Sequence, residues 1–358
     1  MARRAISPMN DPELPPSTLR LRIDAQALAD NWRALDRMSG SAAAGAAVKA
    51  DAYGLGVSTV APILRDAGVR DFFVAHWSEV PPLLTHVPPA HVCVLHGPVI
   101  AADAAFASAT GVRPVINSVH QAQVWRDAGG GVCDLMIDSG INRLGIPPGA
   151  LGDPAVAGLT VDTVMSHLAS ADEDGAQNQA QLALFEQVAN TVPARRRSLA
   201  NSAGIVLGRA YAFDLTRPGL ALYGGVPRRE LAGVIRQVAH PQAAVLQLRD
   251  LSPGDSVGYN ALFTADRPLR AATVSLGYAD GFLRAWTGKG ALRFAGADLP
   301  LLGRVSMDMV VVDVSAAPAI REGDWLDVPY TLLEAAKLTG LSQYELLTLL
   351  GRRFVRSN

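Results

Sequence analysis

The chain has 358 residues, of which 49% are hydrophobic and 18% are charged, so it holds enough apolar material for a sizeable core in one large domain or two. Its formal net charge of -1 gives no electrostatic case for binding nucleic acid or an anionic membrane. No stretch is apolar for long enough to span a bilayer, and Arg3 and Arg4 precede no apolar segment of a signal peptide. We therefore expect a cytoplasmic protein without nucleic-acid or membrane partners.

The first half of the chain predicts a barrel. Residues 1–16, with four prolines among polar neighbours, predict a disordered extension. Residues 17–230 alternate apolar runs with segments of helical period, which implies parallel β-α-β units. About eight units favour an α/β fold of the (β/α)8 TIM type, because no glycine-rich turn of a doubly wound sheet follows the first strand. The expected strands are Ala46–Lys49, Asp71–Ala75, Val92–Leu95, Arg113–Ile116, Cys133–Ile137, Thr160–Ser166, Ser198–Ala200 and Leu220–Tyr223. The expected helices include Asp24–Met38, Ser58–Ala67, Ser118–Ala128 and Ala176–Val192, with Asp24 and Ser118 as N-caps.

The pattern changes near Tyr223–Glu230. Residues 231–358 carry β-type runs punctuated by Gly, Pro and Asp, which predict a C-terminal, mainly β domain. One helix, Leu332–Leu350, is expected near its end. The expected strands are Val234–Leu248, Gly254–Thr264, Arg270–Leu276, Gly290–Phe294, Leu299–Val305, Met309–Val314 and Asp324–Val328.

One lysine stands out in chemical terms. Lys49 ends an apolar run and is followed by small residues and Tyr53. Burial at a strand end lowers the pKa of a lysine and frees its amine as a nucleophile or base. The small residues that follow would let a flat ligand approach the backbone. The alternative is an ordinary lysine that reaches solvent from a strand end.

Further polar residues follow other expected strands, where the active sites of barrels gather. They are Tyr53, Arg143, His167, Asn201, Ser202 and Arg217. Each has an ordinary structural explanation when taken alone: His167 as a satisfied core histidine, and Ser202 as an N-cap. The two cysteines, Cys93 and Cys133, lack metal-ligand spacing, so we expect no metal site. They could form a single disulfide, but in a reducing cytosol we expect free buried thiols.

Taken together and in order, these segments resemble the alanine racemases from about Leu19 to Leu350. The matching segments are Ala47-Val-Lys-Ala-Asp-Ala-Tyr-Gly54, Asp138-Ser-Gly-Ile-Asn-Arg-Leu-Gly145, Ser166-His-Leu-Ala-Ser-Ala-Asp172, Asn201-Ser-Ala-Gly204, Arg217-Pro-Gly-Leu-Ala-Leu-Tyr-Gly224, Gly258-Tyr-Asn-Ala-Leu-Phe263, Leu276-Gly-Tyr-Ala-Asp-Gly281 and Gly303-Arg-Val-Ser-Met-Asp-Met309. The resemblance implies a barrel that binds pyridoxal 5′-phosphate (PLP), followed by a β domain.

The resemblance also implies roles for individual residues. Lys49 would hold PLP as an imine, and Arg217 would face the pyridine nitrogen, where a guanidinium that cannot give up its proton weakens the cofactor as an electron sink. His167 would lie against the ring. The residues implied in cofactor binding are Lys49, Tyr53, His167, Asn201, Ser202, Arg217, Gly219, Leu220 and Tyr344, of which Tyr53, Ser202, Gly219, Leu220 and Tyr344 would hold the phosphate.

The same resemblance implies a two-base mechanism in a homodimer with shared active sites. Lys49 would serve one face of the substrate, and Tyr259 from the partner subunit the other. Met307 and Tyr278 would come from the partner as well, with Tyr278 narrowing the entrance. Arg143 would bind the cofactor's phenolic oxygen and the carboxylate of a small amino-acid substrate.

Two positions depart from the family pattern. Leu55 stands where the family often has a histidine, which we interpret as a packing change. Met136 stands where many members carry a lysine, modified to a carbamate, whose negative charge positions the arginine. Methionine cannot form a carbamate, so the orientation of Arg143 needs another explanation.

The expected function is racemisation of L-alanine and D-alanine, supplying D-alanine for peptidoglycan. A second hypothesis keeps the fold and cofactor but changes the substrate to another small amino acid such as serine, because a pocket discriminates by only ~1–3 kcal/mol per methylene. A third is a non-catalytic PLP-carrier protein. Such carriers resemble the barrel alone, and Tyr259 and the residues after 230 argue against that hypothesis. A decarboxylase of related fold commonly has a cysteine in its second domain, where this chain has none.

Overall fold

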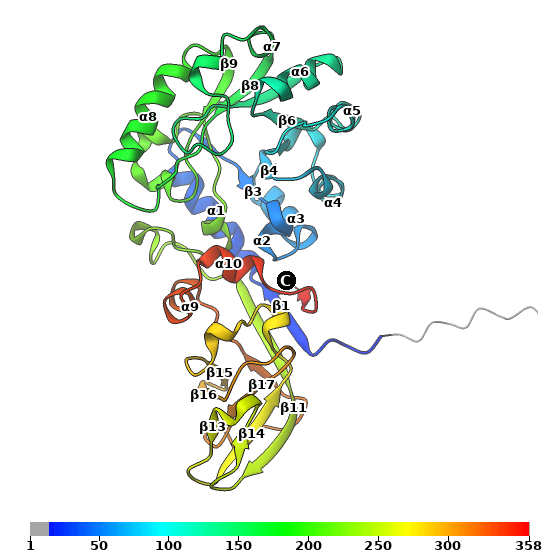
Figure 1. Cartoon of the computed structure of the whole chain (residues 1–358), viewed down its shortest axis with the longest axis vertical. Helices are drawn as coiled ribbons and strands as arrows, with labels where there is room; N and C mark the ends of the chain where they lie inside the picture. Colours follow the sequence, from blue (N-terminus) through cyan, green and yellow to red (C-terminus); the bar gives the residue numbers. More distant parts are fainter. Residues whose placement is uncertain (1–13, 358) are drawn as a thin grey trace, which may run out of the picture.

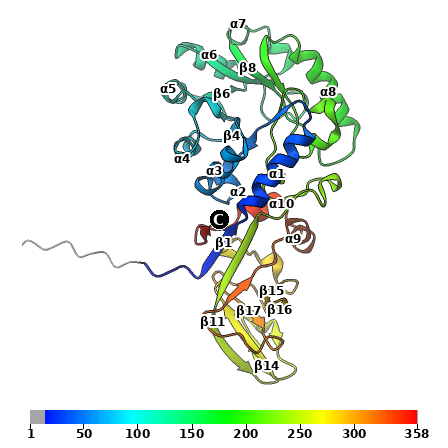
Figure 2. The same ribbon diagram turned by 180° about the vertical axis from the view of Figure 1, so that it is seen from behind.

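A computed structural model describes residues 14–357, which form a barrel and a strand-rich second domain (Figure 1). Helices α9 (Leu332–Thr339) and α10 (Gln343–Thr348) and the end of the chain lie between the two parts, as the view from behind in Figure 2 also shows. The disorder expected over residues 1–16 falls mostly outside the described residues, and residues 14–16 are exposed without regular structure. No helix in the described part is long and apolar enough to cross a membrane.

Seven parallel strands make most of the barrel wall, in the order β3 to β9. They are β3 (Ala46–Ala47), β4 (Phe72–Val74), β5 (Val92–Val94), β6 (Arg113–Ile116), β7 (Val132–Met136), β8 (Thr160–Met165) and β9 (Ala194–Ser198). The helices of this half are α1 (Ala25–Met38), α2 (Lys49–Tyr53), α3 (Val57–Ala67), α4 (Val80–Leu84), α5 (Ala101–Thr110), α6 (Val119–Asp127), α7 (Pro154–Ala157) and α8 (Ala176–Ala189).

The eighth strand closes the barrel. β10 (Leu215–Thr216) pairs in parallel with β2 (Ala43–Ala44), the continuation of β3 across Gly45. On its other side, Arg217 N donates to the carbonyl of Ala200 just after β9 at 2.8 Å. These bonds join the first and last strands, so the expected (β/α)8 barrel is confirmed.

The strand expected over Leu220–Tyr223 was wrong, because these residues form a turn of 3-10 helix, η6. Pro218 has no N–H for a strand ladder. The N–H groups of Gly219 and Ala221 instead donate to the Ser202 hydroxyl at 2.9 and 3.2 Å. The backbone here turns away from the sheet, and its donors face a side chain.

The expected helix starts were confirmed. Asp24 Oδ1 accepts from Ala27 N at 2.8 Å, and Ser118 Oγ accepts from Gln121 N at 3.1 Å. The single helix expected over 332–350 was wrong: there are two, α9 (Leu332–Thr339) and α10 (Gln343–Thr348). Gly340 adopts a φ of 76°, which ends the first helix in the left-handed region.

The second domain is built on an eight-stranded sheet in the order β14-β17-β16-β15-β18-β11-β1-β19. Its strands are β1 (Leu19–Ile23), β11 (Ala239–Leu251), β14 (Leu269–Val274), β15 (Ala291–Phe294), β16 (Ala297–Leu302), β17 (Val310–Asp313), β18 (Trp325–Asp327) and β19 (Val355–Ser357), and a hairpin, β12 (Ser256–Val257) and β13 (Phe263–Thr264), stands beside it. The domain boundary at residue 230 stays a prediction. β1, however, lies in this sheet between β11 and β19, although it precedes the barrel in the chain.

A cluster of buried and partly buried charges lies near the N-terminal ends of the barrel strands. Arg196 binds both carboxylate oxygens of Asp71 at 2.9 and 2.7 Å and reaches Asp162 at 3.0 Å. Arg113 lies 3.3 Å from Asp71 and 3.5 Å from Asp134. We call these five residues the floor cluster. This end of a barrel serves stability.

Candidate active site

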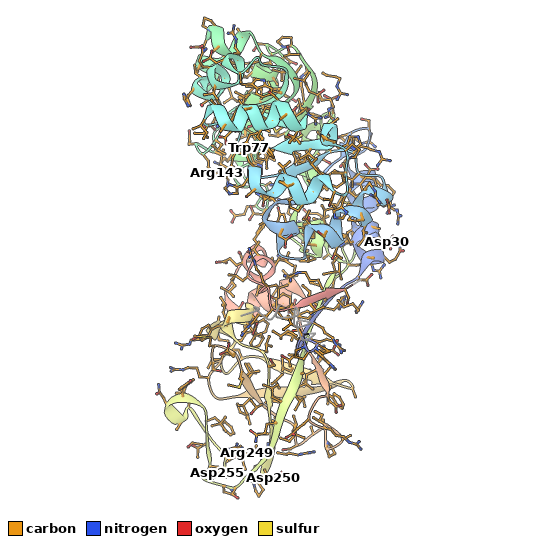
Figure 3. The ribbon with its side chains drawn as sticks, turned by 90° about the vertical axis from the view of Figure 1, so that its right-hand side faces the viewer. Asp30, Trp77, Arg143, Arg249, Asp250 and Asp255 are labelled. Atoms are coloured by element: carbon orange, nitrogen blue, oxygen red, sulfur yellow. The ribbon has the colours of Figure 1, made fainter. Side chains whose placement is uncertain are left out.

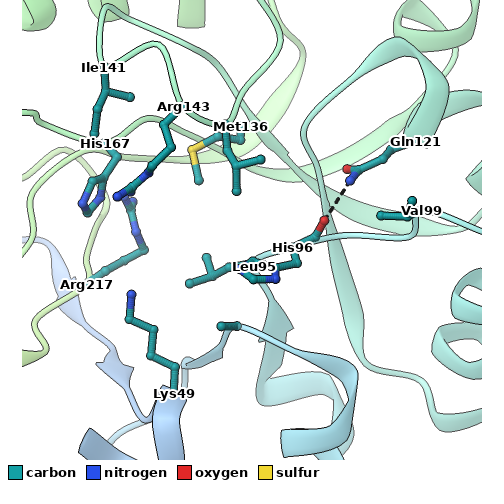
Figure 4. Close-up of a pocket in the computed structure, with 12 residues that line it drawn as sticks. Lys49, Leu95, His96, Val99, Gln121, Met136, Ile141, Arg143, His167 and Arg217 are labelled. Atoms are coloured by element: carbon teal, nitrogen blue, oxygen red, sulfur yellow. Dashed lines mark hydrogen bonds between the residues drawn. The ribbon is translucent and has the colours of Figure 1, made fainter. Parts of the chain in front are cut away.

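A cavity of about 560 Å³ lies at the C-terminal ends of the barrel strands (Figure 4). It brings together four of the residues singled out from the sequence for the site, Lys49, Arg143, His167 and Arg217, with Met136 beside them. Its other lining residues are Ala75, Leu95, His96, Val99, Gln121, Ile141 and Leu144. The location agrees with the position of active sites in this fold.

Lys49 is presented by an unusual turn. The four residues after it, Ala50 to Tyr53, have φ between 52° and 56°, the left-handed region that non-glycine residues avoid at a cost of roughly 1–3 kcal/mol each. Glu79 Oε1 accepts from Ala50 N at 2.5 Å, and Asp51 Oδ1 accepts from Val57 N at 2.7 Å. A segment so strained persists because its surroundings fix it, and it directs Lys49 into the cavity.

The surroundings of Lys49 favour its neutral amine. Burial is the main cause that lowers the pKa of Lys49. The positive charges of Arg143 and Arg217 lower it further, and the carboxylate of Glu79 opposes them. An amine with a lowered pKa is suited to nucleophilic attack and to proton transfer.

Arg217 and His167 form the opposite wall. Arg217 is buried and donates to the Ser198 hydroxyl and, at 2.5 Å, to the Ser166 carbonyl. Burial lowers the pKa of Arg217 to about 10. Burial, and then the charges of Arg217, Arg143 and Lys49, lower the pKa of His167 to about 3. His167 is therefore a neutral imidazole beside a cationic guanidinium at neutral pH.

A group of hydroxyls and backbone N–H groups suits an anion. Ser202 Oγ faces Gly219 N and Ala221 N, as given above. A Cβ on Gly219 would lie 2.2 Å from Tyr53 Oη, so only glycine fits there. The ring of Tyr53 lies 6.3 Å from that of Tyr344. Leu220 is buried in the same turn. Hydroxyl and main-chain donors of this kind bind phosphate groups well.

Asn201, adjacent to Ser202, shapes the same turn. Its Oδ1 accepts from Gly204 N at 2.9 Å, and its backbone forms a parallel bridge with Arg217. The side chain thus caps the turn that carries Ser202. A direct contact of Asn201 with a cofactor stays a prediction.

Arg143 lies in the cavity beside Met136, and among residues 14–357 no carboxylate comes within 4.0 Å of its guanidinium. Asp138 does not pair with it, because Asp138 Oδ1 accepts backbone N–H groups at 2.9, 3.1 and 3.1 Å from residues 140–142. The carboxylate therefore shapes the loop that carries Arg143.

Three predicted residues lie elsewhere. Tyr259, Tyr278 and Met307 line a separate hollow of about 520 Å³ on the second domain. Tyr259 is 65% exposed and Met307 is 52% exposed. Figure 3 shows Arg143 on the barrel and Asp255, four residues before Tyr259, at the far end of the second domain. One chain does not bring these residues together with Lys49.

His96 also lines the cavity, although it was not among the residues predicted from the sequence. Gln121 Nε2 donates to its carbonyl at 2.8 Å (Figure 4), and its ring lies edge-on to that of His76 with centroids 4.2 Å apart. His96 follows the expected strand 92–95 directly. The rule that selected Lys49 and His167, a polar residue after a strand, would have found it.

The two cysteines are free and buried, as expected. Within the described residues, no group of three or more His, Cys, Asp or Glu side chains could hold a metal ion. The ionisable side chains that line the cavity are an amine, two guanidinium groups and the two imidazoles of His96 and His167.

Known proteins similar to this chain share the family that the site residues indicate. Residues 23–227 match the family model of the alanine racemase N-terminal domain, and residues 238–358 match that of the C-terminal domain. An alanine racemase of Methylobacterium nodulans is 42% identical over 352 residues, which covers 94% of this chain and 95% of that protein. An alanine racemase of Rhizobium meliloti is 40% identical over 375 residues, covering 98% and 99%.

Among solved structures, the crystal structure of alanine racemase from Bartonella henselae with covalently bound pyridoxal phosphate has a TM-score of 0.87 to this chain. Its sequence is 34% identical, and the match covers 96% of this chain and 99% of that one. Because the family models span both domains and the relatives match over nearly their full length, this chain belongs to the alanine racemase family.

Proposed function

We propose that this protein binds PLP covalently through Lys49 and interconverts L-alanine and D-alanine. The observation that carries the proposal is Lys49 itself: a half-buried amine with a lowered pKa that shares one cavity with Arg217, His167 and Arg143. Membership of the alanine racemase family supports the same reaction.

The residues present fit PLP. The turn gathers the Ser202 hydroxyl and the N–H groups of Gly219 and Ala221, which bond to one another and would donate to the phosphate instead. Arg217 offers a fixed cation for the ring nitrogen, and Lys49 offers the amine for covalent attachment. When bound, PLP supplies a conjugated ring that stabilises the electron pair left by removal of the α-proton.

Racemisation needs a proton removed from one face of the α-carbon and another delivered to the opposite face. We assign the first position to Lys49 Nζ and the second to the phenol of Tyr259. Arg143 would orient the substrate through its carboxylate. The exposure of Tyr259 and Met307 supports their insertion into a second copy of the chain, so we propose a homodimer with shared sites.

We also propose that alanine is the preferred substrate among small amino acids. The proposal includes a cytoplasmic location and the supply of D-alanine for peptidoglycan. Serine is the main alternative substrate, because a pocket separates side chains that differ so little in size by only ~1–3 kcal/mol per methylene. The second domain, with Tyr259, Tyr278 and Met307 lining its hollow, argues against a non-catalytic PLP carrier.

Attachment of the cofactor can be tested by reduction. The chain has three lysines, Lys49, Lys289 and Lys337, so borohydride reduction of the PLP-loaded protein followed by peptide mapping separates them cleanly. We expect the adduct on Lys49 and none in Lys49→Ala, with Lys337→Ala as control. An adduct that persists in Lys49→Ala would refute the assignment.

The reaction and the shared site can be tested with chiral analysis. The purified protein with PLP should racemise L-alanine faster than L-serine. Mixing inactive Lys49→Ala with inactive Tyr259→Phe should recover activity, because a heterodimer carries one intact site. No recovery, despite demonstrated subunit exchange, would mean that each site is built from one chain.

A further inference from the structure

The last residues of the described chain lie against the turn that presents Lys49. Arg356 donates from Nη2 and Nε to the carbonyl of Gly54 at 2.7 and 3.1 Å. Gly54 directly follows the left-handed run, and a Cβ on it would lie 2.5 Å from the Leu347 carbonyl oxygen. One guanidinium thus holds the end of the strained turn, while Glu79 holds its start.

Three residues earlier, Arg353 holds a different part of the molecule. Its Nε and Nη2 bind the two carboxylate oxygens of Asp280 at 2.7 and 2.8 Å, and its Nη1 binds Asp308 at 2.7 Å. The Asp280 side chain is 1% exposed and also accepts from Gly277 N at 3.0 Å. A bidentate pair to a buried carboxylate fixes geometry strongly.

These two aspartates belong to the loops that carry Tyr278 and Met307. Tyr278 N donates to the Ser306 carbonyl, and Ala279 N to the Met307 carbonyl, each at 3.0 Å. The loops are thereby joined to each other, and Arg353 holds both. The backbone of the C-terminal segment contacts the same loop, since Gly351 N donates to the Asp280 carbonyl at 3.2 Å.

We infer that Arg353 and Arg356 are positioning residues, and that residues 351–356 act as a brace between two half-sites. Arg356 orients Lys49 in its own subunit, whereas Arg353 orients the loops that enter the partner's site. Such a brace must lie between the barrel and the second domain, and Figure 1 shows α10 and the end of the chain there. The inference rests on the proposed function for the use of the two loops.

The role of Arg356 can be tested without the reaction. In Arg356→Met, hydrogen exchange of residues 49–56 should rise while that of residues 277–281 stays unchanged. PLP should bind about tenfold more weakly in a titration of its visible absorption, because a charge-assisted hydrogen bond is lost. Arg356→Lys should restore part of the affinity, since an ammonium can still donate to Gly54.

The matched control is Arg70→Met, since Arg70 also donates to backbone carbonyls, those of Arg65 and Val69 at 3.1 and 2.8 Å, on the barrel surface. It should change neither PLP affinity nor exchange at residues 49–56. If Arg356→Met leaves both readouts unchanged, or raises exchange equally throughout the chain, the positioning role is overturned.

Mixing experiments separate the two arginines. Arg353→Met should bind PLP normally and lose activity about tenfold as a homodimer. Mixed with inactive Lys49→Ala, it should recover wild-type activity per intact site, because its Lys49 meets unaltered loops of the partner. Arg356→Met mixed with Lys49→Ala should not recover wild-type activity, because the only Lys49 in that heterodimer lies in the subunit that lacks Arg356. Arg293→Met, which removes the exposed 2.6 Å pair with Asp298 in the same domain, is the control.

Equal behaviour of the two mixtures would overturn the brace. Absence of alanine racemisation by the wild-type protein would instead refute the proposed function. The exchange and PLP-binding measurements on Arg356 would still decide its role in that case.

Discussion

The guanidinium of Arg217 donates a 2.5 Å hydrogen bond to the backbone carbonyl of Ser166, the residue immediately before His167. A second donor of the same guanidinium meets the Ser198 hydroxyl. Arg217 therefore binds the C-terminal ends of two neighbouring strands, β8 and β9, and fixes their positions. It also presents its charge to the cavity.

Arg217→Lys tests this double role. An ammonium keeps the charge but cannot hold both acceptors in the planar geometry of a guanidinium. We expect kcat/KM for alanine to fall roughly 10- to 100-fold, the effect of losing one charge-assisted hydrogen bond. Steady-state kinetics are the measurement, with the exposed Arg195→Lys as control. Unchanged kinetics would show that the charge alone matters.

The lowered pKa of His167 predicts a pH dependence of stability. In the unfolded chain this imidazole takes up a proton below pH 6.5, whereas in the folded protein it does so only near pH 3. The unfolded state binds more protons in that window, so the folded state loses about 1.4 kcal/mol per pH unit as the pH falls. Urea unfolding of the PLP-free protein at pH 5.5 and 4.5 measures this loss.

The comparison variant is His167→Leu, which cannot titrate at this position. As the pH falls over the same window, the free energy of unfolding of this variant should decrease less steeply than that of the wild type. The difference between the two slopes should be about 1.4 kcal/mol per pH unit. Parallel curves for the two proteins would mean that His167 is protonated in the folded state.

The floor cluster predicts a strong effect on stability alone. Arg196→Met removes the bidentate partner of the buried carboxylate of Asp71 and one of the two closest partners of Asp162, which should cost about 3 kcal/mol. Arg195 also pairs with Asp162, but its side chain is 67% exposed, so Arg195→Met should cost no more than about 1 kcal/mol. Chemical unfolding of both variants gives the two values. Equal losses would contradict this account of the cluster.

Met136 predicts independence from dissolved carbon dioxide. The family lysine at this place needs it to form a carbamate, and methionine does not. Wild-type activity should be the same with and without bicarbonate, while Met136→Lys should become dependent on it. Rates in carbon-dioxide-depleted buffer are the measurement, and a wild-type rate that falls on depletion would refute the prediction.

An anion or water should then face Arg143, because Asp138 is engaged by its own loop. Crystals grown with bromide in place of chloride should show an anomalous peak beside Arg143. A direct Asp138–Arg143 pair without a peak would favour the carboxylate.

Much of the barrel was predictable because its signals are local. The strand at Arg113–Ile116 and the caps at Asp24 and Ser118 depend on neighbouring residues, and the structure has them as expected. Lys49 and His167 follow buried strands, but each has an ordinary explanation alone, and the resemblance of their segments to the alanine racemases singled them out. The turn at Leu220–Tyr223 was not found, since its conformation depends on a hydroxyl distant in the chain, that of Ser202.

Other features depend on contacts that no short segment encodes. The left-handed run after Lys49 contains no glycine before Gly54, and it is held by Glu79 and Arg356 from remote parts of the chain. The proposed grouping of Tyr259 with Lys49 would require a second chain, because within one chain Tyr259 lines a hollow separate from the cavity of Lys49.

The position of β1 between β11 and β19 makes the barrel an insertion within the second domain. During synthesis, Leu19–Ile23 emerges more than two hundred residues before its partner Ala239–Ala243. The sheet cannot be completed until the whole barrel and the final strand have been made. A fragment that begins after the barrel would leave β11 and β19 with a missing neighbour, so the second domain depends on the chain's first strand for its own completion.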